Sequence, residues 1–175
     1  MKLEIGPGPE KLGPDWTTVS AAPSPSVDLL CEWGMDPLPF EDGTVDEVYA
    51  CHVIEHVPWL LTEAALVEVW RILKVGGLIE LHTICFETLA RDYHHGDLEP
   101  GRQGHPMRNL SYRLFSYSHR VGDRACLQWH HALFDSRYLT ELLRGAGFKD
   151  CGSVKEPRGP EKHGRYNLGV KAVKA

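Results

Sequence analysis

The chain has 175 residues, of which 42% are apolar and 25% charged, and its mean hydropathy is −0.29. This length suits a single domain over residues 1–175 and excludes two domains of ordinary size. No apolar stretch approaches the roughly 18–20 residues of a membrane span. Five dispersed cysteines without a CxxC pair favour reduced thiols over a disulfide framework, so we expect a cytoplasmic protein.

Charge is distributed unevenly along the sequence. Residues 1–101 carry 5 Lys/Arg against 18 Asp/Glu, a net of −13, and residues 102–175 carry 14 against 6, a net of +8. The two blocks can simply face each other in the fold. Alternatively, the five arginines of residues 102–124 can bind an anionic substrate, because guanidinium groups pair with phosphate and carboxylate; they are Arg102, Arg108, Arg113, Arg120 and Arg124. The acidic net charge and the lack of a long basic stripe disfavour bulk nucleic-acid binding.

Strand and helix patterns alternate along the chain. Strands are expected at 3–5, 16–19, 26–31, 45–54, 78–84, 149–155 and 166–173, and helices at 58–74, 86–93 and from an N-cap at Asp135 or Ser136. Residues 94–130 have no regular pattern, and we expect them to form an insertion or lid on the substrate side. The alternation predicts an α/β fold with a mostly parallel sheet and an antiparallel edge strand.

A glycine turn, "GPG" at 6–8, follows the first strand at the point where a helix is expected to begin. Glycine there lets backbone N–H groups approach a ligand. The dinucleotide fingerprint GxGxxG requires a third glycine where this chain has Lys11, and the GK[ST] of a P-loop is missing. By itself, the turn is as consistent with a plain structural role as with ligand binding.

Three segments occur in a characteristic order: "LEIGPG", "DPLPFEDGTVDEVYACHVIEHV" and "EVWRILKVGGLIEL". Together with the later "WHHALFDSRYLTELLRGAGFKD", they resemble class I S-adenosylmethionine-dependent methyltransferases, especially small bacterial ones linked to surface-polysaccharide pathways. The resemblance implies a Rossmann-like, seven-stranded methyltransferase fold, here abbreviated at its N-terminus. It also implies S-adenosylmethionine as the cofactor, bound at the carboxyl ends of the first four strands.

The resemblance implies a role for each matching position. Cofactor-binding residues would be Glu4, Gly6, Pro7, Gly8, Ser20, Met35, Asp36, Cys51 and His52. Members of the family usually carry an acid at the end of the second strand, where it holds both ribose hydroxyls, and this chain has Ser20 followed by Ala21. Losing such a contact costs on the order of 1.5–3 kcal/mol, so we expect cofactor affinity to be lower by about ten- to a hundredfold.

Histidines offer a second kind of chemistry. "HVIEH" at 52–56 matches the HxxEH pattern of zinc peptidases, but a strand precedes it and Pro58 leaves little room for the required helix. A divalent ion held by His52, Glu55 and His56 is an alternative, although we favour a structural role for Glu55 and His56 and assign no metal. His52, His56 or His131 could remove the proton of an acceptor, or His131 could be a packed core residue.

The sequence therefore predicts methyl transfer to an oxygen or nitrogen of a small, anionic or glycosylated metabolite. The alternative is a catalytically inert methyltransferase-like module that acts in binding or assembly. A homodimer stays open as a further arrangement.

Overall fold

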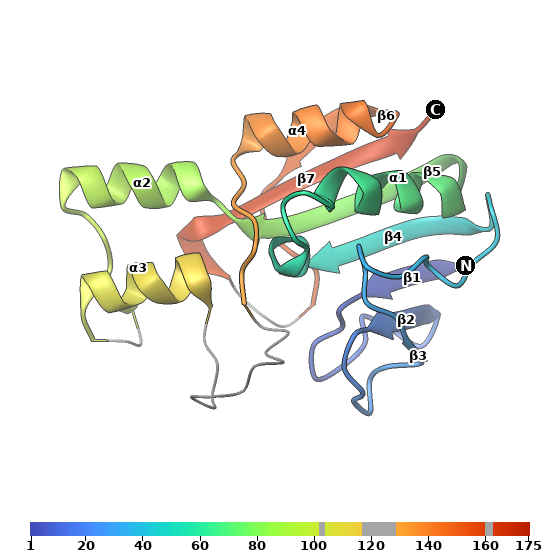
Figure 1. Ribbon diagram of the computed structural model, residues 1–175, viewed down its shortest axis with the longest axis horizontal. Coiled ribbons are helices and arrows are strands. Elements are labelled where there is room, and N and C mark those ends of the chain that lie inside the picture. The colour runs from blue at the N-terminus through green and yellow to red at the C-terminus, as the bar shows by residue number, and fades with distance from the viewer. Residues whose placement is uncertain (102–103, 117–128, 160–162) are drawn as a thin grey trace.

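The computed structural model describes residues 1–101, 104–116, 129–159 and 163–175. One seven-stranded sheet runs through the molecule in the order β3-β2-β1-β4-β5-β7-β6 (Figure 1). Its strands are β1 (Lys2–Ile5), β2 (Trp16–Ser20), β3 (Leu29–Leu30), β4 (Val45–Cys51), β5 (Leu73–Ile84), β6 (Phe148–Val154) and β7 (Asn167–Lys174). All neighbouring pairs are parallel except those that β7 makes with β5 and β6. The predicted antiparallel strand is therefore β7, one place inside the edge strand β6.

The helices are α1 (Thr62–Ile72), α2 (Phe86–His95), α3 (Pro106–Phe115) and α4 (Ser136–Gly145), with short 3-10 turns η1 (Ile54–His56) and η3 (Gly164–Tyr166). Helix α1 forms because Ala65, Leu66, Val69 and Ile72 recur on one face, and all four are buried against the sheet. Helix α4 begins where the Asp135 carboxylate accepts a hydrogen bond from the Tyr138 amide, as an N-cap does.

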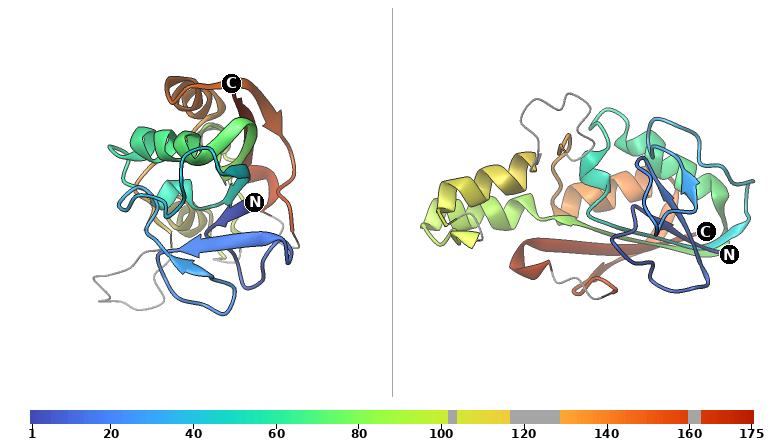
Figure 2. Two further views of the ribbon diagram at one scale, coloured as in Figure 1. Left: turned by 90° about the vertical axis from the view of Figure 1, so that its right-hand side faces the viewer. Right: turned by 90° about the horizontal axis from the view of Figure 1, so that it is seen from below.

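Helices α1 and α4 cover one face of the sheet, and the pair α2 and α3 extends beyond the ends of the strands (Figures 1 and 2). The face under α1 and α4 is the apolar core, with Leu3, Val19, Val48, Ile79 and Leu81 all essentially inaccessible to solvent. No helix within the described ranges is long and apolar enough to cross a membrane.

The helix expected after Gly8 does not form. Residues 6–15 instead run as an irregular loop directly into β2, because the connection is short and Pro7, Pro9 and Pro14 interrupt it. The loop lies on the face opposite α1, since the Leu12 amide donates to the Glu4 carboxylate, which points from β1 to that side.

Residues 155–159 and 163–166, between β6 and β7, also fold over this second face. The Arg158 guanidinium contacts Glu80 of β5 at 2.6 Å and Glu47 of β4 at 2.6 Å, and its peptide N–H donates to the Tyr49 hydroxyl. This segment contacts the loop of residues 6–15: a Cβ added to Gly159 would lie 3.4 Å from Leu12 Cδ2. Within the described residues, loops thus cover the face that helices cover in a doubly wound sheet.

Candidate active site

The carboxyl end of β1 carries the glycine turn. Gly6 has a φ of +67° and donates its amide to the Val19 carbonyl at 2.8 Å, which binds the turn to the end of β2. Gly8 does not adopt a positive φ; its carbonyl accepts from the Ser26 hydroxyl at 2.7 Å. The turn is therefore held firmly by neighbours within this chain.

Glu4 lies immediately before the turn and is only 5% exposed. Its carboxylate accepts the Leu12 amide at 2.9 Å. Burial raises the pKa of the Glu4 carboxyl, and the hydrogen bond from Leu12 and the charge of Lys11 oppose this only in part. Glu4 is thus a buried acid near the carboxyl end of β1, where a molecule bound by the glycine turn would lie.

The end of β2 lacks an acid, as the sequence indicated. The Ser20 hydroxyl lies here and accepts weakly from the Ala22 amide at 3.4 Å. The next acid, Asp28, is engaged elsewhere: its carboxylate accepts from the amide and hydroxyl of Thr18 and pairs with Lys11. Asp28 therefore fixes the start of β3 and does not replace an acid at position 20.

Met35 and Asp36, predicted to lie near an adenine, belong to the loop that follows β3. The Met35 side chain is exposed, and Asp36 accepts the Glu32 amide at 3.0 Å, closing a local turn. Neither residue contacts the glycine turn in any described hydrogen bond, so their role in binding stays a prediction.

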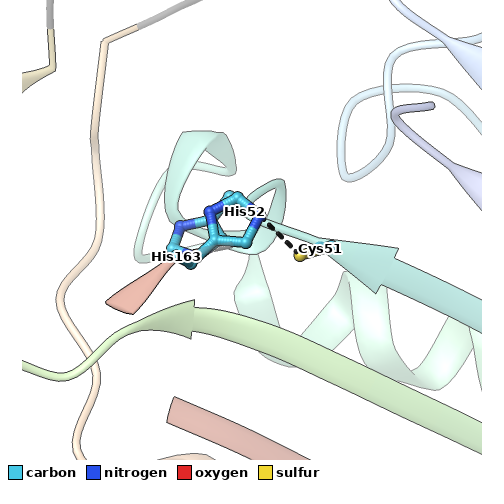
Figure 3. A group of neighbouring side chains, drawn as sticks. All are labelled: Cys51, His52 and His163. Carbon is cyan, nitrogen blue, oxygen red and sulfur yellow. Dashed lines mark hydrogen bonds between the residues drawn. The ribbon is translucent and has the colours of Figure 1, made fainter. Parts of the chain in front are cut away.

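The carboxyl end of β4 brings three side chains together (Figure 3). Cys51 ends β4, His52 follows it, and His163 arrives from the segment between β6 and β7. Cys51 Sγ and His163 Nε2 are 3.5 Å apart, and the His52 and His163 rings stack with their centroids 4.1 Å apart. The sequence predicted Cys51 and His52 here, but it gave no signal for His163.

His52 is held in a strained backbone conformation, with a φ of +54°. Its amide donates to the His82 carbonyl, and its Nδ1 lies 2.9 Å from Glu55 Oε1. The other Glu55 oxygen accepts from the Thr83 hydroxyl at 2.9 Å. Burial alone would raise the pKa of Glu55, but the hydrogen bond and charge of His52 keep it below its ordinary value. Glu55 is therefore an ionised, buried partner that orients the His52 ring.

His56 points away from this group. Its Nδ1 lies 3.1 Å from the Trp129 carbonyl oxygen, and its ring packs edge-on against His130, with centroids 4.9 Å apart. His52, Glu55 and His56 thus do not converge as a set of three ligands. Glu55 and His56 each make hydrogen bonds in the segment after β4.

A cavity of about 490 Å³ opens beside this segment. Its lining is mostly apolar and aromatic: Trp59, Phe86, Leu114, Phe115, His130, His131, Ala132 and Leu133. The His131 amide donates to the Glu55 carbonyl at 2.7 Å, so the cavity wall is attached to the segment that carries His52. This cavity is large enough for a small organic molecule.

His130 offers a basic nitrogen to the cavity. Its Nδ1 lies 2.9 Å from the Arg113 carbonyl, an acceptor, so Nδ1 carries the proton and Nε2 keeps its lone pair when the ring is neutral. Burial lowers the pKa of His130, which favours that neutral form. The sequence had favoured the neighbouring His131 for such a role.

Only part of the arginine cluster lies in the described residues; Arg102, Arg120 and Arg124 fall outside them. The Arg113 guanidinium stacks over the Tyr166 ring at 4.4 Å, and burial lowers the pKa of Arg113. Arg113 Nε finds no hydrogen-bond partner among the described residues. The backbone of Arg113 therefore lies beside the cavity through the hydrogen bond between its carbonyl and His130, whereas its guanidinium lies over Tyr166.

Comparisons with known proteins show which proteins this chain is similar to. The methyltransferase domain family matches residues 15–81, which run from β2 to the middle of β5. No curated protein matches the chain significantly. Solved methyltransferases match over nearly all of it, so the fold is the Rossmann-like class I methyltransferase fold.

Three such structures illustrate the likeness. A SAM-dependent methyltransferase from Thermotoga maritima, described as a possible histamine N-methyltransferase, is 21% identical, with a TM-score of 0.61 over 99% of this chain and 81% of that one. A SAM-dependent methyltransferase from Archaeoglobus fulgidus is 12% identical, with a TM-score of 0.60 over 99% and 85%. The trans-methyltransferase CalH, in complex with SAH, is 20% identical, with a TM-score of 0.58 over 99% and 51%.

Proposed function

We propose that this protein is an S-adenosylmethionine-dependent methyltransferase acting on a small molecule. The main support is that the Glu4–Gly6 turn and the Cys51–His52 segment come together at the carboxyl ends of the parallel strands of a class I methyltransferase sheet. An apolar cavity lies beside the segment after β4. In this fold, ligands bind outside the carboxyl ends of the strands.

The residues present fit one end of the cofactor better than the other. The buried Glu4 carboxylate and the turn at Gly6 suit the charged amino-acid end, since an acid accepts from an ammonium group and a turn donates amides. The Ser20 hydroxyl is left for the ribose, and it forms neutral hydrogen bonds that are weaker than those of a carboxylate. When bound, the cofactor would supply an electrophilic methyl group.

The cavity lining supports an acceptor with an apolar or aromatic body. His130 Nε2 would accept the proton of an acceptor hydroxyl or amine, with the Arg113 carbonyl fixing the ring. His131 lines the same cavity and would help to position the acceptor. Arg113 supports an anionic group on that acceptor, because a guanidinium stacked on an aromatic ring still offers N–H donors.

Titration with S-adenosylhomocysteine by calorimetry tests the proposal. We expect saturable one-to-one binding, weaker by about ten- to a hundredfold than a site with the ribose acid would give. Glu4→Gln should weaken it further, and Glu10→Gln, at an exposed position on the adjoining loop, should not. A folded protein that binds no ligand at millimolar concentration would overturn the proposal.

That negative result would favour the second candidate, an inert methyltransferase-like module for binding or assembly. One observation supports it: the chain's own Leu12 amide already occupies one oxygen of the Glu4 carboxylate, on the face where loops replace helices. The cavity at Phe115 and Leu133 would then bind a ligand or partner without chemistry.

A further inference from the structure

The cluster at the end of β4 has the composition of a transition-metal site. Cys51 offers a sulfur, and His52 and His163 each offer an imidazole nitrogen, with the three ligand atoms all within 4.8 Å of one another. Within the described ranges, these three residues form the one such group of His, Cys, Asp and Glu. We infer that Cys51, His52 and His163 bind a zinc ion.

The spacing of the donor atoms supports this inference. Zn–S and Zn–N bonds of about 2.3 and 2.0–2.1 Å at a tetrahedral angle place sulfur and nitrogen roughly 3.6 Å apart. Cys51 Sγ and His163 Nε2 are 3.5 Å apart already. The His52 and His163 rings are stacked and inclined by only 22°, so one ring has to turn before both imidazole nitrogens point at the same ion.

His52 is prepared for a ligand on one specific atom. Glu55 lies at Nδ1, so Nδ1 carries the proton and Nε2 keeps its lone pair, and Nε2 is buried with no hydrogen-bond partner in the described structure. A buried polar nitrogen without a partner is costly, and a metal ion would remove that cost. The carboxylate behind the histidine is the usual outer partner of a zinc-bound imidazole.

Glu55 is itself fixed, since Thr83 donates to its second oxygen and it is only 2% exposed. The His52 backbone, which has a positive φ, is held in place by the hydrogen bond that its amide donates to the His82 carbonyl. These contacts leave the His52 ring little freedom, so His52 is the fixed ligand and the His163 ring is the one that turns toward the ion.

The donor set selects the ion. One thiolate and two imidazoles suit Zn²⁺, whereas Mg²⁺ and Ca²⁺ prefer oxygen ligands. Binding replaces the Cys51–His163 contact with two coordinate bonds, and the thiol proton of Cys51 leaves to the solvent. Three protein ligands leave a fourth coordination position for water or another ligand. All three residues are partly exposed, although the His52 Nε2 atom itself is buried.

The test uses the metal alone, so its outcome does not depend on whether the protein binds S-adenosylhomocysteine. Apo-protein is titrated with Zn²⁺ against a chromophoric chelator, and with Co²⁺ in an absorption spectrometer. We expect one equivalent of Zn²⁺ to bind and Co²⁺ to give a thiolate charge-transfer band. Stoichiometric binding without that band would place the ion elsewhere and overturn the inference.

Variants identify the ligands. Cys51→Ser should abolish the charge-transfer band, and His163→Ala should lower Zn²⁺ affinity more than the 10–100-fold expected when an outer partner is removed. Glu55→Gln should fall in that 10–100-fold range and keep the band. Cys151→Ser and His94→Ala are matched controls away from the cluster, and they should bind as the wild type does.

Far-UV circular dichroism of each apo-variant confirms that it is folded. Cys51→Ser replaces sulfur by oxygen and nearly keeps the side-chain shape, so this variant alone tests the site if His163→Ala does not fold. Equal Zn²⁺ affinity in the wild type and in folded Cys51→Ser and His163→Ala would overturn the inference.

Discussion

Gly6 and Val53 are in direct contact across the ends of β1 and β4. A Cβ at Gly6 would lie 2.4 Å from Val53 Cγ2, closer than two carbon atoms can approach. This contact joins the glycine turn to the segment that carries Cys51 and His52. The glycine is thus required by packing as well as by its left-handed backbone.

Gly6→Ala should therefore destabilise the protein through both effects. We expect a loss of about 2–4 kcal/mol in the free energy of unfolding, from strain at positive φ together with overpacking. Urea denaturation measures it. Gly43→Ala is the matched control, because Gly43 has a φ of +65° and open space around it, so only the backbone strain applies. Equal losses at the two positions would mean that the Val53 contact carries no weight.

Ser20→Asp should increase cofactor affinity. The new carboxylate stands at the end of β2, where it would accept hydrogen bonds from both ribose hydroxyls. Such charge-assisted bonds contribute about 1.5–3 kcal/mol, which corresponds to about a ten- to hundredfold lower Kd for S-adenosylhomocysteine in calorimetry. Ser24→Asp, on the exposed connection after β2, is the control. No gain in a folded Ser20→Asp variant would place the ribose elsewhere.

Arg158→Ala should destabilise the second face of the sheet. Truncation leaves the Glu80 carboxylate, only 5% exposed, without its guanidinium, while the hydrogen bond that the Arg158 backbone N–H donates to the Tyr49 hydroxyl remains. We expect a loss of about 1–3 kcal/mol, because a buried charge loses one of its partners. Arg137→Ala breaks an exposed pair with Glu141 on α4 and should change stability by less than about 0.5 kcal/mol.

Glu80 should also make stability depend on pH. Burial opposes ionisation, but the hydrogen bonds from His82 and Arg158 hold the pKa of Glu80 below its ordinary value. Because the folded pKa lies below the unfolded one, this contribution is complete above the unfolded pKa and is lost as the pH falls through the folded pKa.

We therefore expect the free energy of unfolding to decrease as the pH falls from about 5 into the acid range. Glu80→Gln should make this decrease less steep, and Glu87→Gln, an exposed acid on α2, should leave it unchanged. Urea denaturation at a series of pH values measures both. An identical slope for Glu80→Gln and wild type would assign the acid sensitivity to other carboxylates.

Most of the sheet could be predicted because β1, β4, β5 and β7 each carry several apolar residues close together in the sequence. Strand boundaries differ from the prediction where contacts with other segments set them. β5 begins at Leu73 because that residue pairs with Val45. β3 is shortened to Leu29–Leu30 because Asp28 is hydrogen-bonded to Thr18. Helix α1 begins at Thr62, since the residues from Pro58 form a turn that closes with the Leu61 amide on the Pro58 carbonyl. These are tertiary effects that a one-dimensional pattern does not contain.

The candidate site divides in the same way. Cys51 and His52 could be placed from a motif that directly follows a strand. His163 could not, because its position depends on the segment after β6 folding back over the sheet. That fold depends on the Arg158–Glu80 pair, whose members are 78 residues apart in the sequence. His130 is preferred over His131 as the proton acceptor because its Nδ1 is hydrogen-bonded to the Arg113 carbonyl, a tertiary contact that the sequence does not reveal.

The strand order has a consequence for how the molecule assembles. β6 joins the sheet only through β7, which follows it in the sequence and lies between it and β5. During synthesis, β5 therefore presents an unpaired edge until β7 has been made, and such an edge is a template for pairing with another chain. Arg158 and His163 lie in the segment between β6 and β7, so they reach their positions only when β7 pairs with β5. The pairing of β7 with β5 joins distant parts of the sequence and is therefore expected to be slow. The cluster of Cys51, His52 and His163 would form only once this pairing is complete.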